Sequence, residues 1–216
     1  MSEFGDIKLT EKPQDSLLRI ESFNDVKVWL QRDLEQRGAI KSGGAIGMFV
    51  LWRDPVNMFM ALLRLKEWCL NARPSRLLKW SIAFLYRRSQ LKLGFSIPPN
   101  TFGPGLAIVH YGPIVVNGNA RIGENCRIHV CVNIGGAGGL VSQEIAKELA
   151  PRLGKNIYIA PGVKIYGPVY IADGCAIGAN AVVNRSFETP NISIAGVPAE
   201  QISKKGSTGL ILKAEI

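Results

Sequence analysis

Residues 153–184 read LGKNIYIAPGVKIYGPVYIADGCAIGANAVVN, and an aliphatic side chain returns at every sixth position of this stretch. The aliphatic series is Leu153, Ile159, Ile165, Ile171, Ile177 and Val183. Four positions after each of the first five stands a small or β-branched residue, namely Ile157, Val163, Val169, Cys175 and Ala181. A period of six fits neither an α-helix nor a long alternating strand. It predicts a coil of short strands and tight corners, with one aliphatic residue of each strand pointing inward.

The same period occurs upstream in a second register, formed by Val116, Ile122, Ile128 and Ile134. The next aliphatic residue of the series, Leu153, follows Ile134 by 19 positions, one more than three repeats. Segment 136–152, GAGGLVSQEIAKELAPR, therefore interrupts the coil. We expect a glycine-rich exit, a short helix over SQEIAKEL and a return to the coil. Loops that leave a regular scaffold are common sites of function.

The segment before the repeats has a different composition. Residues 51–93 contain nine basic and only two acidic residues, and their apolar residues recur at steps of three and four. This spacing predicts amphipathic helices. Their basic surface has two interpretations, a solvated face or a contact with an anionic membrane or substrate. We therefore divide the chain into a helical region (1–93), a coil with an inserted loop (94–203, loop 136–152) and a tail (204–216).

Several classes of protein are disfavoured. In the helical region the longest uncharged run, 42–52, is too short to span a bilayer, and no nucleic-acid-binding signature is present. The polar start MSEFGDIKLTEKPQDS does not resemble an export signal, so we expect a cytoplasmic protein with reduced cysteines. His129 and Cys131 stand close in sequence, but they should project in different directions from strand and corner. We therefore expect no metal site, and we expect Cys126 and Cys175 to be packing residues.

Segments HYGPIVVNGNARIGENCRIHVCVNIGGAGG (110–139), CAIGANAVVN (175–184) and AGVPAEQIS (195–203) resemble the serine acetyltransferase family. The likeness is closest to the branch encoded with capsule and exopolysaccharide genes, and it covers about half of the chain. It implies a mainly β fold, a left-handed parallel β-helix of hexapeptide repeats behind an N-terminal helical region. It also implies an enzyme that is a homotrimer and binds acetyl-CoA in the groove between subunits, with no metal.

The resemblance implies roles for individual residues. His110 stands at the position of the catalytic base, and histidine suits this role because it titrates near neutral pH. The implied acetyl-CoA contacts are Gly135, Gly136 and Ala137 at the reactive end, Gly162 and Ala179 along the pantetheine, and Arg185 and Lys204 at the phosphates. Two positions depart from the family: Ala137 replaces a usual threonine, and Glu200 stands where a basic residue is common. His129 has no assigned role, because the family has His or Gln one position later, at Val130.

The acceptor is predicted from further departures. Relatives that acetylate free serine carry ionisable side chains at the positions of Val109, Leu149–Ala150 and Ser96, where this chain is neutral. A zwitterionic amino acid needs charged partners at both ends. We therefore expect an uncharged hydroxyl acceptor, a sugar or glycan intermediate of surface polysaccharide biosynthesis. The alternatives are serine O-acetylation in cysteine biosynthesis, which the terminal Ile216 favours, and a non-catalytic binding solenoid.

Overall fold

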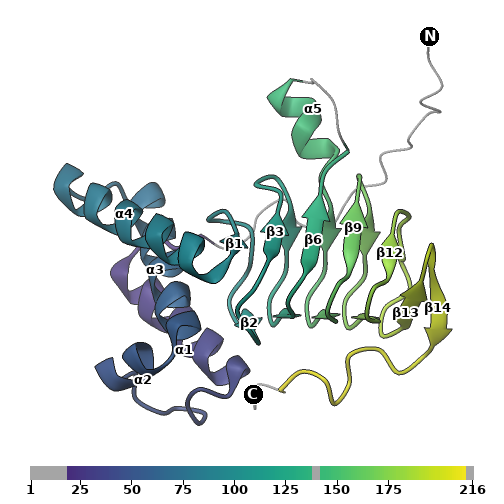
Figure 1. The fold of residues 1–216 in the computed structure, drawn as a ribbon, viewed down its shortest axis with the longest axis horizontal. Coiled ribbons are helices and arrows are strands. Elements are labelled where there is room, and N and C mark those ends of the chain that lie inside the picture. Colours follow the sequence, from purple (N-terminus) through teal and green to yellow (C-terminus); the bar gives the residue numbers. More distant parts are fainter. Residues whose placement is uncertain (1–18, 138–141, 213–216) are drawn as a thin grey trace.

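The computed structural model describes residues 19–137 and 142–212 (Figure 1). Its helices are α1 (Phe23–Arg37), α2 (Met48–Arg53), α3 (Pro55–Asn71), α4 (Arg76–Leu93) and α5 (Gln143–Glu148). Its strands are β1 (Phe95–Ser96), β2 (Ala107–Ile108), β3 (Ile114–Val116), β4 (Arg121–Ile122), β5 (Arg127–Ile128), β6 (Val132–Gly135), β7 (Arg152–Leu153), β8 (Tyr158–Ile159), β9 (Lys164–Tyr166), β10 (Tyr170–Ile171), β11 (Ala176–Ile177), β12 (Val182–Val183), β13 (Ser193–Gly196) and β14 (Ala199–Ser203).

The strands form a coil with three faces. Sheet A contains β1, β3, β6, β9 and β12, sheet B contains β4, β7 and β10, and sheet C contains β2, β5, β8, β11 and β13 with β14 at its end. All pairs are parallel except β13 with β14. Successive strands of one sheet lie one turn of the coil apart, and the turns stand side by side in Figure 1. The predicted β-helix is therefore present.

The pairing register stacks the repeated aliphatic residues inside the coil. Ile134 pairs with Ile165 in sheet A, and Ile128 pairs with Ile159 in sheet C. Each of these four side chains is 0% exposed. The small positions of the repeat are buried as well, including Cys126, whose thiol pKa is raised by burial. The repeat thus gives one continuous apolar core, and the packing role predicted for Cys126 and Cys175 is confirmed.

The corners between sheets need backbone conformations that few residues adopt. At the corners that lead from sheet C to sheet A, which we call the C–A edge, the left-handed residues are Gly112, Cys131, Gly162 and Asn180. Gly162 has a φ of 79°, and a Cβ there would lie 2.0 Å from the Asn180 Oδ1 atom of the next turn. Glycine is therefore required at this close approach between turns.

Helices α1 to α4 gather at the end of the coil that begins with β1 and β2 (Figure 1). Helix α1 begins with a capping box between Ser22 and Asp25 and ends at Gly38, which is left-handed. These caps satisfy backbone groups that a helix leaves unpaired at its ends. Helix α4 packs on α3 and is tied to the first turn by Tyr86, whose hydroxyl donates to the Ile97 carbonyl.

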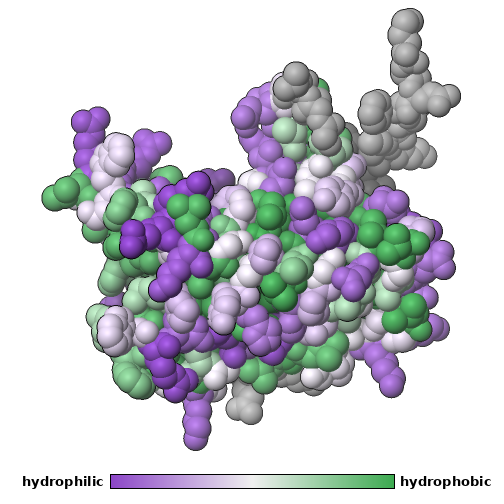
Figure 2. Space-filling view, in the orientation of Figure 1, coloured by the Kyte–Doolittle hydropathy of each residue, from purple (hydrophilic) through white to green (hydrophobic). Residues whose placement is uncertain are grey.

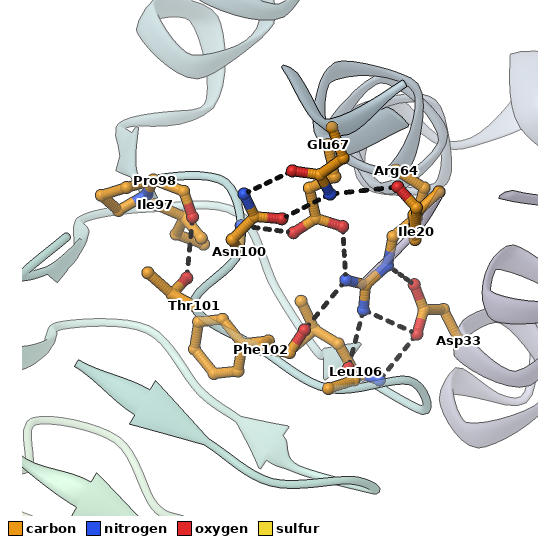
Figure 3. Close-up of polar contacts among 12 residues, drawn as sticks. Ile20, Asp33, Arg64, Glu67, Ile97, Pro98, Asn100, Thr101, Phe102 and Leu106 are labelled. Carbon is orange, nitrogen blue, oxygen red and sulfur yellow. Dashed lines mark hydrogen bonds and ion pairs between the residues drawn. The ribbon is translucent and has the colours of Figure 1, made fainter. Parts of the chain in front are cut away.

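A buried charge cluster joins the helices to the coil (Figure 3). The Arg64 guanidinium lies 2.7 Å from Asp33 Oδ2 and 2.9 Å from Glu67 Oε2, with side chains 0–1% exposed. Arg64 also donates to the carbonyls of Phe102 and Gly103 in the first turn of the coil. Because buried charges must be paired and hydrogen bonded, this network holds α1, α3 and the coil in one arrangement.

The inserted loop leaves the coil between β6 and β7 and carries α5, which projects from the coil in Figure 1. Ser142 caps α5 by accepting a hydrogen bond from the Ile145 amide. The short helix predicted within SQEIAKEL is therefore present. The division of the chain into three domains at residues 93 and 203 stays a proposal.

Candidate active site

His110 and His129 lie on successive turns of the C–A edge. His110 follows β2 and is exposed, whereas His129 follows β5 and is partly buried. Their ring centroids are 6.3 Å apart, and the His129 ring lies 5.2 Å from that of Tyr158. The amides of Val109 and His129 donate to the carbonyls of Ile128 and Ile159 on the next turns. The ladder of the coil therefore fixes the backbone that carries both imidazoles.

The two histidines differ in their surroundings. The His129 Nε2 atom is buried and has no hydrogen-bond partner among the described residues. Burial lowers the pKa of His129 first, and the nearby Arg127 and His110 lower it further. His129 is therefore a neutral ring at neutral pH. His110 is the more exposed ring of the pair, and in the part of the chain that the structure describes no carboxylate is hydrogen bonded to it.

A small cavity of about 170 Å³ lies against the strand that leads to His110. Val109 lines it, together with the arginines Arg37, Arg53 and Arg127. Arg37 is held in place by Asp54 at 2.7 Å and by the Ile108 carbonyl at 2.8 Å. Within residues 19–137 and 142–212, the side chains of Arg53 and Arg127 make no hydrogen bond or ion pair. The cavity is therefore cationic and can receive an anionic group.

The sequence did not indicate these arginines as site residues, because they come from different parts of the chain. Arg37 is the last residue of α1, and Arg53 is the last residue of α2. Arg127 occupies an outward position of β5 in the hexapeptide register. The one usable signal was the basic character of the helical segment, which includes Arg53. The contact of α1 with β2 brings the helix ends beside the coil.

The predicted acetyl-CoA residues fall on different edges of the coil. Gly162 and Ala179 lie on the C–A edge, one and two turns after His129. Gly135, Gly136 and Ala137 lie where the chain leaves sheet A towards sheet B, and so does Arg185 two turns later. The width of sheet A separates this second edge from His110 within one chain. The structure therefore places His110, Gly162 and Ala179 along one line, and does not bring the glycine segment to them.

The two predicted phosphate contacts lie apart from each other. Arg185 lies 3.6 Å from Glu200 and stacks on Phe187, so the acidic residue that departs from the family pattern is paired with it. Lys204 is exposed and follows β14, near the corner between sheets B and C. No group of three or more His, Cys, Asp or Glu side chains that could hold a metal occurs among the described residues.

The repeats match a family of known proteins. Residues 150–185 match the model described as "Bacterial transferase hexapeptide (six repeats)". This part of the chain is therefore similar to the repeats of that family. The predicted fold, a left-handed β-helix of hexapeptide repeats with N-terminal helices, is confirmed.

Several proteins whose sequences are similar to this chain are named serine acetyltransferases. The chain is 31% identical to the serine acetyltransferase of Mycobacterium tuberculosis over 142 residues, which cover 65% of this chain and 58% of the relative. It is 30% identical to that of Buchnera aphidicola from Schizaphis graminum over 122 residues, or 55% and 45% of the two chains. The chain spans about half the length of the curated relatives that it matches.

Solved structures of serine acetyltransferases are also similar to this chain. The chain matches the serine acetyltransferase of Brucella abortus strain S19, solved in complex with coenzyme A, with a TM-score of 0.62 and 25% identity over 84% of this chain and 67% of the other. The Vibrio cholerae enzyme gives a TM-score of 0.68 at 19% identity, over 86% and 69% of the two chains, and this likeness concerns the fold alone.

These comparisons correct the predicted acceptor. The sugar or glycan prediction, and with it surface polysaccharide biosynthesis and the capsule-associated branch, is wrong, because the relatives are named serine acetyltransferases. The prediction assumed that charged partners for serine must stand at Val109, Ala150 and Ser96. In the structure Ala150 is buried and Ser96 is exposed on β1, while charged side chains reach Val109 from the helical region.

None of the helices within the described residues is long and apolar enough to cross a bilayer.

Proposed function

We propose that this protein is an acetyl-CoA-dependent serine O-acetyltransferase, with His110 as its general base. The observation that carries the proposal is the C–A edge, where an exposed His110 stands beside a neutral, partly buried His129. The similarity to serine acetyltransferases over 65% of this chain supports the reaction class. The proposed enzyme uses acetyl-CoA as co-substrate and no metal, and we expect it in the cytoplasm.

In the proposed reaction the imidazole of His110 takes the proton of the serine hydroxyl. The hydroxyl oxygen attacks the thioester carbon of acetyl-CoA, the carbon–sulfur bond breaks, and the coenzyme A thiolate recovers the proton from His110. A histidine base suits this chemistry because its ordinary pKa lies near neutral pH. Burial lowers the pKa of His129, so this ring adds no positive charge beside His110 at neutral pH.

The cationic cavity beside Val109 supplies the charge that serine needs. The side chains of Arg53 and Arg127 can pair with the amino-acid carboxylate. Asp54, which is ion-paired with the cavity residue Arg37, is our candidate partner for the amino group. These residues replace the ionisable groups that the chain lacks at Val109, Ala150 and Ser96.

The proposed enzyme is a homotrimer. Acetyl-CoA would lie along Gly162 and Ala179, and a neighbouring subunit would bring Gly135, Gly136 and Ala137 to its reactive end. This arrangement unites the two edges that sheet A separates within one chain. Arg185 and Lys204 stay as candidates for the phosphates. Light scattering should give three times the 23.6 kDa mass of the chain, and a monomer would remove the shared site.

The test is release of coenzyme A thiol from acetyl-CoA with L-serine as acceptor. We expect saturable release, and a loss of about 10² to 10⁴ in turnover for His110→Ala, as for a general base. Arg127→Ala should raise the KM for serine with a smaller effect on kcat, because it would remove a binding contact present in ground and transition states alike. His129→Gln serves as the control next to the base and should lose much less turnover.

Two results would contradict the proposal. The first is thiol release that does not increase with L-serine. The second is an active His110→Ala variant together with an inactive His129→Gln variant, since the base would then lie one turn further along the edge.

A further inference from the structure

Helix α4 has two apolar faces, and only one of them is covered. Its inner face buries Ile82, Tyr86 and Leu93 against α3 and the first turn of the coil. Its outer face carries Leu77, Trp80, Phe84 and Leu91, with exposed fractions of 79%, 76%, 66% and 67%. At 3.6 residues per turn these four side chains fall within about 60° of arc, opposite the buried face. They form a continuous stripe, which we call the outer stripe.

Basic residues border the outer stripe on both sides. Arg76 and Arg87 lie on one flank, and Arg88 and Lys92 lie on the other, by the same helical spacing. No Asp or Glu occurs in α4, and all four flanking side chains are exposed. On the face seen in Figure 2, the corner where α4 lies in Figure 1 shows strongly hydrophobic and strongly hydrophilic residues next to one another.

We propose that the outer stripe of α4 binds the surface of an anionic lipid bilayer, with the helix lying in the plane of the interface. An apolar stripe containing Trp and Phe enters the boundary between headgroups and acyl chains to about 5–10 Å. Trp80 suits this boundary because an indole ring has an apolar body and a polar N–H. The flanking cations then meet anionic headgroups, which attract basic side chains near such a surface.

The basic residues beside the outer stripe favour a lipid surface over a second copy of the chain as its binding partner. Two outer stripes packed face to face would bring the cations of both α4 helices together, with no acidic residue of α4 to offset them. An anionic surface instead neutralises the cations while the stripe is buried. A pure apolar contact would also leave the regular placement of cations on both flanks unexplained. The proposal is independent of the proposed acetyl-transfer site, because no residue of α4 belongs to that site.

The experiment is flotation of the full chain with vesicles of phosphatidylcholine alone or with a third of phosphatidylglycerol. We expect binding to the anionic vesicles, with a loss when salt is raised to about 0.5 M, because surface attraction is screened. Phe84→Glu should lower partitioning about tenfold or more. The substitution removes the burial of one aromatic side chain and adds a negative charge that anionic lipid repels.

Ile202→Glu is the matched control. Ile202 is 65% exposed, against 66% for Phe84, and lies in β14 at the opposite end of the coil. It introduces the same charge and should leave binding unchanged. Both variants should keep the thiol-release activity of the wild type on soluble substrates.

Three outcomes would overturn the proposal: no binding of the wild type to anionic vesicles, equal losses in Phe84→Glu and Ile202→Glu, or dissociation of the oligomer by Phe84→Glu without lipid. The last outcome would assign the outer stripe to contacts between copies of the chain.

Discussion

The coil and helices α1 to α4, which we call the helical cap, are stabilised in different ways. Inside the coil the buried side chains are apolar, and the backbone is paired turn by turn with its neighbours. At the joint with the cap, the largest fully buried side chain is Arg64, paired with Asp33 and Glu67. In the coil, the same apolar contact between successive turns is repeated many times. The helical cap is joined to the coil by the single Arg64 network, so a substitution in that network should lower the free energy of unfolding more than one in a single turn of the coil.

Loss of the buried cation should have the largest effect on stability. Arg64→Met would leave Asp33 and Glu67 buried without their partner, and breaking a buried pair in this way costs about 3–5 kcal/mol. Chemical denaturation should therefore show a lower free energy of unfolding. Arg32→Ala is the control, because its ion pair with Glu124 is 33% and 25% exposed and contributes about 0–1 kcal/mol. Equal effects of the two variants would remove the contrast between joint and surface.

The second-largest loss of stability should come from a substitution that creates a cavity inside the coil. Ile165 is 0% exposed and stacks between Ile134 and Val183, so Ile165→Ala should lower the free energy of unfolding by about 2–5 kcal/mol. The exposed Val115 in sheet A provides the comparison, with an expected change of about 0.5 kcal/mol or less for Val115→Ala. If the coil instead tolerated Ile165→Ala as well as Val115→Ala, stacking of the repeats would not be its main source of stability.

A smaller, pH-dependent effect should come from the edge of the coil. The pKa of His129 is lowered in the folded chain from an ordinary value of 6.5, so below that pH the unfolded chain binds more protons. The stability contributed by the neutral ring is therefore fully present above pH 6.5 and is lost as the pH falls below it. Unfolding of the wild type and of His129→Gln at about pH 7.5 and about pH 5.5 should show a smaller loss in the variant. Parallel losses in both proteins would place the pH dependence elsewhere.

The smallest effect on stability should come from the one exposed cysteine. Cys131 lies at a corner of the C–A edge, while Cys69, Cys126 and Cys175 are buried with thiols whose pKa is raised by burial. A thiol reagent should modify one cysteine in the native protein, and Cys131→Ser should abolish that fast reaction with little change in unfolding. Mass spectrometry of the labelled peptide identifies the site. Fast modification of Cys126 would mean that the interior of the coil opens readily.

The structure of the repeated part of this protein could be predicted from the amino-acid sequence alone. The aliphatic residues of LGKNIYIAPGVKIYGPVYIADGCAIGANAVVN are separated by a fixed number of positions, so each turn buries the same kind of side chain on the turn before it. The inserted loop with its short helix was predictable for the same reason, because it breaks the register. His110 was predicted as the base from family resemblance, and its role awaits the activity test.

Which distant segments share a surface follows from how the helices pack on the coil, and the sequence pattern does not show it. Arg37 and Arg53 line the same cavity as Val109 because α1 packs against β2 and α2 packs against α3, and no local pattern encodes these contacts. The acceptor was predicted from the neutral residues at Val109, Leu149–Ala150 and Ser96, and that comparison left out charged side chains that other segments bring beside Val109. Likewise, the buried trio of Asp33, Arg64 and Glu67 reads in the sequence as ordinary surface charge. The hexapeptide period and the burial of its aliphatic residues depend on residues that are close together in the sequence. A cavity lined by side chains far apart in the chain depends instead on how the helices pack on the coil.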